Sequence, residues 1–193
     1  MTTNQPLSLF ISSKMQELIE ERRAVQDALS DYHMNGWLWE KDAGARPESI
    51  RHTYLKEVEA CDLYIGLFWL GYGPYTIEEF EHARVHKKPC LVYEKHEDVE
   101  RRDPQLKAFL ERIGKVDNPK GLTICWFKTT EELAGRVQAD VVHLLTESFR
   151  EKQQAASQLP KSIAITADHG SVAAYKIEGN ITLNNQRQAD DKS

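Results

Sequence analysis

The sequence predicts an α/β protein with a five-stranded parallel sheet and helices on both of its faces. Apolar runs of strand length alternate five times with segments of helical periodicity over residues 1–154, which implies parallel pairing through right-handed crossovers. The most apolar run, 62–69, shows no alternation of polar and apolar side chains, as expected of a strand that is covered on both faces. A hydrophobic share of 40% and a charged share of 28% are typical of a globular domain.

The first half of the chain contains two strand–helix units and the central strand. Apolar runs indicate the strands, and apolar side chains three or four residues apart indicate the helices. Asn35-Gly36 is expected to end the first helix, and Ser49 is expected to cap the second. The expected elements are strand 7–13, a helix from Met15, strand 37–39, a loop over 40–47, helix 49–60 with Ile50, Tyr54, Leu55 and Val58 on its inner face, and the central strand 62–69.

Glycine and proline mark the turns of the second half. Residues 71–75 predict a turn, and Thr76 is expected to begin the helix that follows the central strand. The expected elements are this helix with Ile77, Phe80 and Ala83 on its inner side, strand 89–93, a charged loop over 95–103, helix 104–113, strand 122–127 and a long closing helix over 129–154.

Residues 155–193 differ in sequence pattern from the domain over 1–154. Short β-like runs are separated by Asp168-His169-Gly170 and by a second turn over 178–180, which predicts a short β-ribbon. Roughly 25 residues are too few for an independent core. We expect the ribbon to pair with other copies of the chain, which predicts a homo-oligomer, because an exposed β-edge is a template for pairing. The alternative is a flexible tail.

Composition excludes several classes of partner. A formal charge of -5 gives no basic field for nucleic acid, and the longest apolar run, 63–70, is too short to span a bilayer. The first residues lack the features of a signal peptide, so a cytoplasmic protein is expected. The widely spaced cysteines, Cys61, Cys90 and Cys125, indicate reduced thiols rather than disulfides or a zinc site. Neither a G-x-G-x-x-G motif nor a Walker P-loop follows a predicted strand.

The strand order predicts where a ligand would bind. In an open parallel sheet, ligands lie beyond the carboxyl ends of the strands where the order reverses, which for the flavodoxin-like order 2-1-3-4-5 is between the first and third strands. Ser12-Ser13-Lys14 is expected on one side, with hydroxyls and backbone N–H groups at a helix N-terminus that favours phosphate. Ser13 as an ordinary helix cap is the alternative.

The turn after the third strand is expected on the other side of this crevice. Its aromatic side chains offer flat faces on which a base or a pyridine ring can stack. At least one of them is expected to belong to the core, and Trp69 is the first candidate for that role because it is nearest the strand. The candidate ligand contacts from this turn are Trp69, Tyr72, Gly73 and Tyr75.

Glu79 is the candidate catalytic residue. A helical projection places Phe80 and Ala83 on the inner side of the helix, Glu78 away from it, and Glu79 on the boundary that faces the crevice. The alternative is structural, because Thr76 and Glu79 have the spacing of a capping box, in which the glutamate bonds the backbone N–H of the cap residue.

Other polar side chains give weaker signals. Asp62 begins the third strand at the end away from the crevice, so we expect a structural role. His82 and His86 have helical i, i+4 spacing that could bind a metal ion, but no third ligand is evident in the sequence and no metal site is expected. Arg46 and Arg51 could bind phosphate, although surface positions are the better expectation.

Several sequence blocks occur in a fixed order: L-F-I-S-S at 9–13, E-E-R at 20–22, E-V-E-A-C-D-L-Y-I-G at 57–66, Y-G at 72–73 and E-E-F-E-H-A at 78–83. Over roughly residues 7–150 the chain resembles a TIR-like domain family of unknown function, often N-terminal in bacterial STAND-type signalling ATPases. More distantly, it is similar to TIR domains and nucleoside 2-deoxyribosyltransferases. The resemblance implies a flavodoxin-like sheet.

The resemblance also implies a chemistry. The deoxyribosyltransferase pattern E-L-G-Y-A lies over 79–83, which places the catalytic glutamate on Glu79, with Glu81 where that family has glycine. Residues 11–13 correspond to a loop that holds ligand in both relatives. The implied reaction breaks the C–N bond at a ribose anomeric carbon with NAD as the substrate, through an oxocarbenium-like state that needs neither a metal nor a cofactor.

The leading hypothesis is an NAD-cleaving enzyme of prokaryotic antiviral defence, which would make a signalling nucleotide or simply consume NAD. The resemblance further implies an effector or STAND-type protein as a partner. One alternative is a non-catalytic TIR-like adaptor that assembles with identical or related chains. Another is a nucleoside or nucleotide N-glycosidase, or a deoxyribosyltransferase-like enzyme, with a different substrate.

Overall fold

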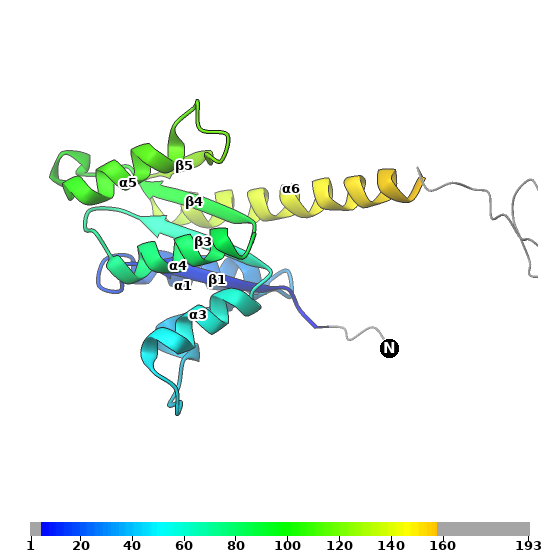
Figure 1. Ribbon diagram of the computed structural model, residues 1–193, viewed down its shortest axis with the longest axis horizontal. Helices are drawn as coiled ribbons and strands as arrows, with labels where there is room; N and C mark the ends of the chain where they lie inside the picture. The colour runs from blue at the N-terminus through cyan, green and yellow to red at the C-terminus, as the bar shows by residue number, and fades with distance from the viewer. Residues whose placement is uncertain (1–4, 158–193) are drawn as a thin grey trace, which may run out of the picture. The chain divides into compact units, whose positions relative to one another are not determined.

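Five parallel strands form one sheet in the order β2-β1-β3-β4-β5, as Figure 1 shows. The computed structural model describes residues 5–157, so the β-ribbon expected after residue 154 lies outside the described residues apart from its first three positions, which continue a helix. The order confirms the predicted α/β fold and its reversal between the first and third strands. The strands are β1 (Ser8–Ser13), β2 (Asn35–Trp37), β3 (Leu63–Phe68), β4 (Cys90–Lys95) and β5 (Ile124–Phe127).

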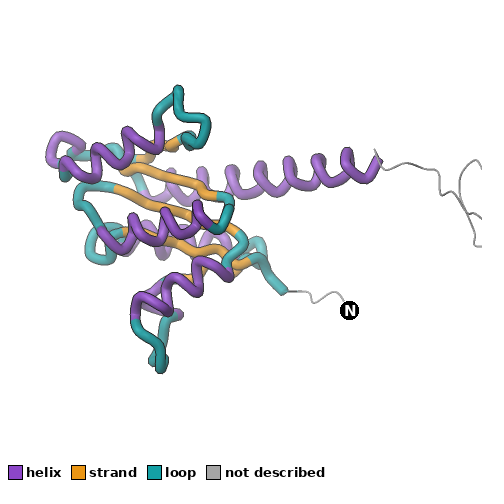
Figure 2. The backbone as a smooth tube through the Cα atoms, in the orientation of Figure 1, coloured by secondary structure: helices purple, strands orange, loops and turns teal. Residues whose placement is uncertain are grey.

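Helices cover both faces of the sheet, and Figure 2 shows the alternation of strands and helices along the chain. The helices α3, α4 and α5 lie on one face, and α1 and the first part of α6 lie on the other (Figure 1). The helices are α1 (Ile19–Ser30), α2 (Trp39–Asp42), α3 (Ile50–Ala60), α4 (Pro74–Val85), the 3₁₀ turn η1 (Val99–Arg101), α5 (Pro104–Gly114) and α6 (Thr130–Ser157). Residues 144–157 of α6 belong to a second unit of the chain, separate from the α/β domain.

Alternate residues of the central strand β3 point to opposite faces of the sheet and so join two different parts of the core. All six residues of β3 are buried, and Tyr64 and Phe68 join the aromatic cluster under α3, α4 and α5. Phe10 of β1 stacks on Tyr64 with 6.0 Å between the ring centroids, and Phe80 of α4 meets the same ring edge-on. The cluster fixes α4 against β1 and β3, and so fixes the start of α4 beside the carboxyl end of β1.

Both ends of α1 differ from the sequence prediction for local reasons. The chain after β1 makes a turn over 14–18, and α1 begins only at Ile19. The helix α1 ends at Ser30, and the chain reverses at His33, which has a positive φ of 55°, rather than at Asn35-Gly36, which lies in β2. The amide of Met34 bonds the carbonyl of Leu29 across this reversal at 3.3 Å, so the chain enters β2 earlier than the prediction of strand 37–39.

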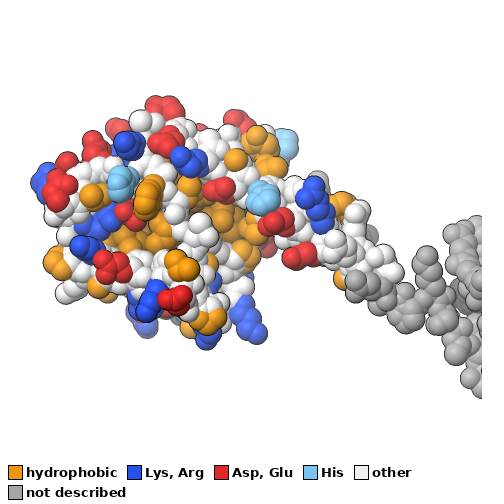
Figure 3. All heavy atoms as spheres, turned by 90° about the horizontal axis from the view of Figure 1, so that it is seen from above, with side chains coloured by type: hydrophobic (Ala, Val, Ile, Leu, Met, Phe, Trp, Pro, Cys, Tyr) orange, Lys and Arg blue, Asp and Glu red, His pale blue; other side chains and the backbone are white. Residues whose placement is uncertain are grey.

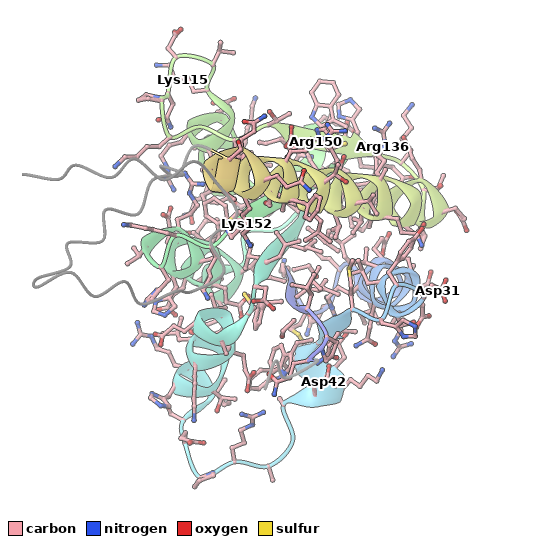
Figure 4. The ribbon with its side chains drawn as sticks, turned by 90° about the vertical axis from the view of Figure 1, so that its right-hand side faces the viewer. Asp31, Asp42, Lys115, Arg136, Arg150 and Lys152 are labelled. Carbon is pink, nitrogen blue, oxygen red and sulfur yellow. The ribbon has the colours of Figure 1, made fainter. Side chains whose placement is uncertain are left out.

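The region between β2 and α3 is more ordered than the loop predicted over 40–47. Asp42, at the end of α2 (Figure 4), accepts a hydrogen bond from the backbone N–H of the buried Leu38 at 2.7 Å, which closes a short helix where a loop is predicted. The prediction for α3 is confirmed at its cap, because Ser49 accepts from the N–H of His52 at 3.2 Å. It is wrong at Ile50, which is 67% exposed.

Charges of both signs are interspersed on the face of the molecule in Figure 3. Each helix within residues 5–157 is either too short or too polar to cross a lipid bilayer.

Candidate functional site

A cavity of about 410 Å³ opens at the carboxyl ends of β1 and β3, where the strand order reverses. Its walls come from β1 and the turn after it, from α1, from the β2–α2 segment and from the starts of α3 and α4. Its size lies within the range of pockets that hold small ligands. The lining residues are Phe10, Ile11, Ser12, Ser13, Lys14, Met15, Gln16, Arg22, Trp37, Trp39, Glu40, Ile50, Tyr54, Tyr72, Gly73, Pro74, Tyr75, Thr76 and Glu79.

Glu79 and Ser12 meet in this cavity from two different elements. The hydroxyl of Ser12, at the end of β1, donates a hydrogen bond to Oε2 of Glu79 on α4. Burial raises the pKa of Glu79 to about 7, the nearby charge of Glu78 adds to the rise, and the hydrogen bond from Ser12 opposes it. The carboxyl is therefore present in both its acid and its base forms near neutral pH.

The capping-box interpretation of Glu79 is wrong. The helix α4 begins at Pro74, with Gly73 as its N-cap, because proline is preorganised for the first helical position. Thr76 is consequently the third helical residue and not the cap, and Glu79 lies nearly a full turn further along. The carboxylate is free of a capping role and is directed to Ser12.

Ser13 is part of a buried network and not a helix cap. The guanidinium of Arg22, which is only 2% exposed, donates to the hydroxyl of Ser13, to the carbonyl of Met15 at 3.1 Å and to the carboxylate of Glu40 at 2.9 Å. The expected helix N-terminus is therefore absent at Ser12-Ser13, since α1 begins at Ile19. Phosphate binding by a helix dipole at this loop is not supported.

Arg22 is a cavity residue that the sequence prediction omits. The signal that could have found it is its place on the apolar side of α1, four residues after Leu18 and three before Val25, both of which are buried. A charged side chain on a buried helical stripe requires partners. Ser13 and Glu40 provide them, and the network holds the turn after β1 in place beside Glu79.

The two predicted loops do lie side by side. Lys14 pairs with Glu17 at 2.7 Å, and the other carboxylate oxygen of Glu17 accepts from the N–H of Gly71 at 3.1 Å. A Cβ atom on Gly71 would lie 1.9 Å from Nζ of Lys14 and 2.4 Å from Oε1 of Glu17, so a larger residue here would displace the ends of these two side chains. Gly73 is buried at the edge of the cavity.

The aromatic side chains divide as expected in that Trp69 is the one outside the cavity, but Trp69 is only partly buried and does not belong to the core. Tyr72 and Tyr75 line the cavity, but Trp69 does not: its indole N–H donates to the carbonyl of Glu97 at 2.9 Å, and Nζ of Lys95 lies 4.6 Å above its ring. Residues 63, 65, 67 and 69 share one side of the strand, and this is the side away from α4.

Trp37, Trp39 and Tyr54 take the place that the prediction gives to Trp69. Trp37 and Trp39 come from the end of β2 and the start of α2, and their rings meet edge-on at 6.1 Å. Tyr54 of α3 packs against Tyr75 at 6.0 Å. The sequence signal for the tryptophans is a W-L-W run at the carboxyl end of a strand next to the reversal of order.

The remaining candidates lie outside the cavity. Glu78 accepts from Arg51 at 2.7 Å and from the hydroxyl of Tyr54, and these bonds hold the pKa of Glu78 below its usual value. Arg46 pairs with Glu57 at 2.7 Å. The carboxylate of Asp62 accepts from the N–H of Ser8 at 2.9 Å, at the other end of the sheet.

Residues 8–163 match the family model described as Domain of unknown function (DUF4062), and no curated protein shows significant similarity. Among solved structures, the fold is similar to that of a CMP N-glycosidase from Clostridium botulinum, BcmB, with 14% identity, a TM-score of 0.51, and coverage of 68% of this chain and 98% of that one. Because the match to the family model covers most of the sequence, the chain belongs to the DUF4062 family.

Proposed function

We propose that the chain cleaves the N-glycosidic bond of a nucleotide, with Glu79 as the catalytic carboxylate. The observation that carries the proposal is the half-buried carboxyl of Glu79 in a ligand-sized cavity, with a pKa of about 7 and a hydroxyl as its hydrogen-bond partner. No salt bridge within residues 5–157 involves this carboxylate. The likeness in fold to a CMP N-glycosidase supports the same class of reaction.

The shape of the cavity suits a nucleotide with its base against the aromatic wall. Trp39, Tyr72 and Tyr75 offer apolar faces to a ring, and Ser12 and Glu79 offer polar atoms to a sugar. A ribose beside Glu79 would have its anomeric carbon close to the carboxylate. A negative charge at that position stabilises the oxocarbenium-like state in which the glycosidic bond is nearly broken.

The reaction balances with Glu79 as its only titrating group. For a pyrimidine nucleotide, the protonated carboxyl gives its proton to the base as the bond breaks, and the bonding electron pair stays on the base nitrogen. The resulting carboxylate stabilises the sugar cation and takes a proton from the water that adds to the anomeric carbon. A pKa of about 7 populates both forms at neutral pH, as a group that acts first as an acid and then as a base requires.

NAD is the first substrate that we propose. Nicotinamide leaves as a neutral molecule that carries the electron pair with it, so the ionised form of Glu79 suffices. Hydrolysis and cyclisation follow from the same intermediate and differ in the nucleophile that reaches it. The loss of NAD, or the nucleotide made from it, would then act in antiviral defence. The active form would be an assembly of several copies of the chain or a complex with a STAND-type partner.

The test is base release by the purified full-length chain. The protein is incubated, dilute and at high concentration to allow assembly, with NAD, CMP and the other nucleoside monophosphates, and the released base is separated and measured. We expect Glu79→Gln to lower the rate by at least about 100-fold, the usual scale of general acid–base catalysis. Glu81→Gln, on the same helix but paired with Arg112 on the surface outside the cavity, is the matched control and should keep most of the activity.

Each outcome has a separate meaning. Equal release by the wild type and by Glu79→Gln would refute the role of Glu79. Base release from a nucleoside monophosphate but not from NAD would keep the reaction class and replace the substrate. Neither release nor binding of any nucleotide, in the dilute or the concentrated sample, would favour the adaptor hypothesis.

A further inference from the structure

Three metal-ligating side chains from two helices converge on the surface away from the cavity. Nε2 of His82 lies 2.8 Å from Oε1 of Glu59, and Nε2 of His86 lies 3.6 Å from the same oxygen. One ligand atom from each of the three lies within 4.8 Å of the others. Glu59, on α3, is the third ligand that the i, i+4 spacing of His82 and His86 on α4 requires, and only the packing of the helices brings it there.

The tautomer of His86 is fixed in the form that binds a metal. Its Nδ1 lies 2.9 Å from the carbonyl oxygen of His82. A carbonyl oxygen only accepts hydrogen bonds, so Nδ1 carries the proton and Nε2 presents its lone pair on the side of Glu59. A backbone carbonyl behind the ring is the usual outer partner of a histidine that ligates a metal.

The distances from Glu59 to the two histidine nitrogens suit a tetrahedral ion. With metal–nitrogen and metal–oxygen bonds of about 2.0–2.2 Å, ligand atoms at tetrahedral angles lie about 3.3 Å apart. The observed separations of 2.8 and 3.6 Å from Glu59 lie on either side of this value, so each changes by roughly half an ångström or less. The side chains of Glu59, His82 and His86 are 49%, 23% and 37% exposed, so an ion can reach them from solvent.

We propose that Glu59, His82 and His86 bind one divalent transition-metal ion of the Zn²⁺ class, with water at the remaining position. Two imidazoles and one carboxylate favour such an ion over Mg²⁺ or Ca²⁺, which prefer oxygen ligands. The ion would link α3 to α4, the helices that carry Tyr54 and Glu79, and would stabilise their packing. It takes no part in the proposed cleavage reaction.

The test is Zn²⁺ binding to the full chain without an affinity tag, after removal of metal with a chelator. Titration calorimetry should give one Zn²⁺ per chain at this site. Zn²⁺ at 100 times its Kd should raise the Tm of the protein by about 5–10 °C, the shift expected for a chain of this size. Mg²⁺ at the same concentration should leave the Tm unchanged. Absence of stoichiometric Zn²⁺ binding would overturn the proposal.

Single substitutions locate the ion. Glu59→Gln, His82→Ala and His86→Ala should each weaken Zn²⁺ binding at least about tenfold, as even outer-shell changes do at metal sites. Glu59→Gln keeps the size of an exposed side chain, so its folding is not at risk. The control is His33→Asn, because His33 is exposed and asparagine tolerates its positive φ.

Two results would refute the assignment. Unchanged affinity in any of the three variants, or lost affinity in His33→Asn, would place the ion elsewhere. Co²⁺ used in place of Zn²⁺ reports the ligands through its absorption, and a sulfur-to-metal charge-transfer band would place it on one of the free thiols instead.

Discussion

Replacing Glu79 with glutamine should make the protein more stable in mildly alkaline solution and leave it unchanged in acid. Burial raises the pKa of Glu79 from its ordinary value of 4.5 to about 7. Between these two pH values the folded protein keeps a proton that the unfolded chain has released. Unfolding therefore releases a proton, and the free energy of unfolding falls as the pH rises from 4.5 to 7.

The size of the effect follows from the same two values. One pH unit is worth about 1.4 kcal/mol for each proton, so the interval from 4.5 to about 7 corresponds to at most about 3–4 kcal/mol. The side chain keeps some contact with solvent, which reduces the expected gain of Glu79→Gln at pH 8 to about 2–3 kcal/mol. At pH 5 the carboxyl is protonated in the folded protein but already mostly ionised in the unfolded chain, so the gain should be below about 1 kcal/mol, and it should vanish only below about pH 4.

The assay is urea unfolding of both proteins at pH 5, 6, 7 and 8, because the difference between them removes the contributions of all other groups. Glu78→Gln is the matched control with the opposite sign. Its carboxylate binds Arg51 and Tyr54 and has a lowered pKa, so this variant should lose about 1 kcal/mol at neutral pH. That loss should fade only as the pH falls through the lowered pKa of Glu78.

A Glu79→Gln variant that is less stable than the wild type at pH 8 would refute the reasoning. Such a result would mean that the ionised carboxylate is held by stabilising bonds, as a capping role or a structural ion pair requires. A gain of equal size at every pH would show that the effect is one of packing and not of ionisation.

Two further predictions concern the neighbours of Glu79. Ser12→Ala removes the hydrogen bond to the carboxylate and should raise the pKa of Glu79 by about one unit. A hydrogen bond to a charged group is worth about 1.5–3 kcal/mol, and water replaces part of it. An NMR titration of the carboxyl checks this prediction, with Ser13→Ala as the control. Arg22→Ala leaves Glu40 without its buried partner and should lower the free energy of unfolding by about 3 kcal/mol or more. A loss below about 1 kcal/mol in urea unfolding would contradict the structural role of this network.

Periodicity predicted the sheet because strand and helix spacings differ and because the order of elements restricts the topology. The strand β3 was recognisable from its unbroken apolar run, and the location of the cavity followed from the reversal of strand order. Helix ends were harder to predict. The chain reverses after α1 at His33, which adopts a positive φ, although Gly36 is the residue that the sequence favours for that conformation. The turn after β1 delays the start of α1 to Ile19.

By itself, the sequence determined the parallel α/β fold and the position of Glu79 beside the first strand, because alternation and helical spacing are local properties. Only the tertiary structure decided that Ser12 is the partner of Glu79, that Arg22 fills the wall of the cavity, and that Trp69 lies outside it. Hydrogen bonds between residues far apart in the chain depend on how helices pack, and no local pattern records that packing. The raised pKa of Glu79 has the same origin, since burial is a property of the folded chain.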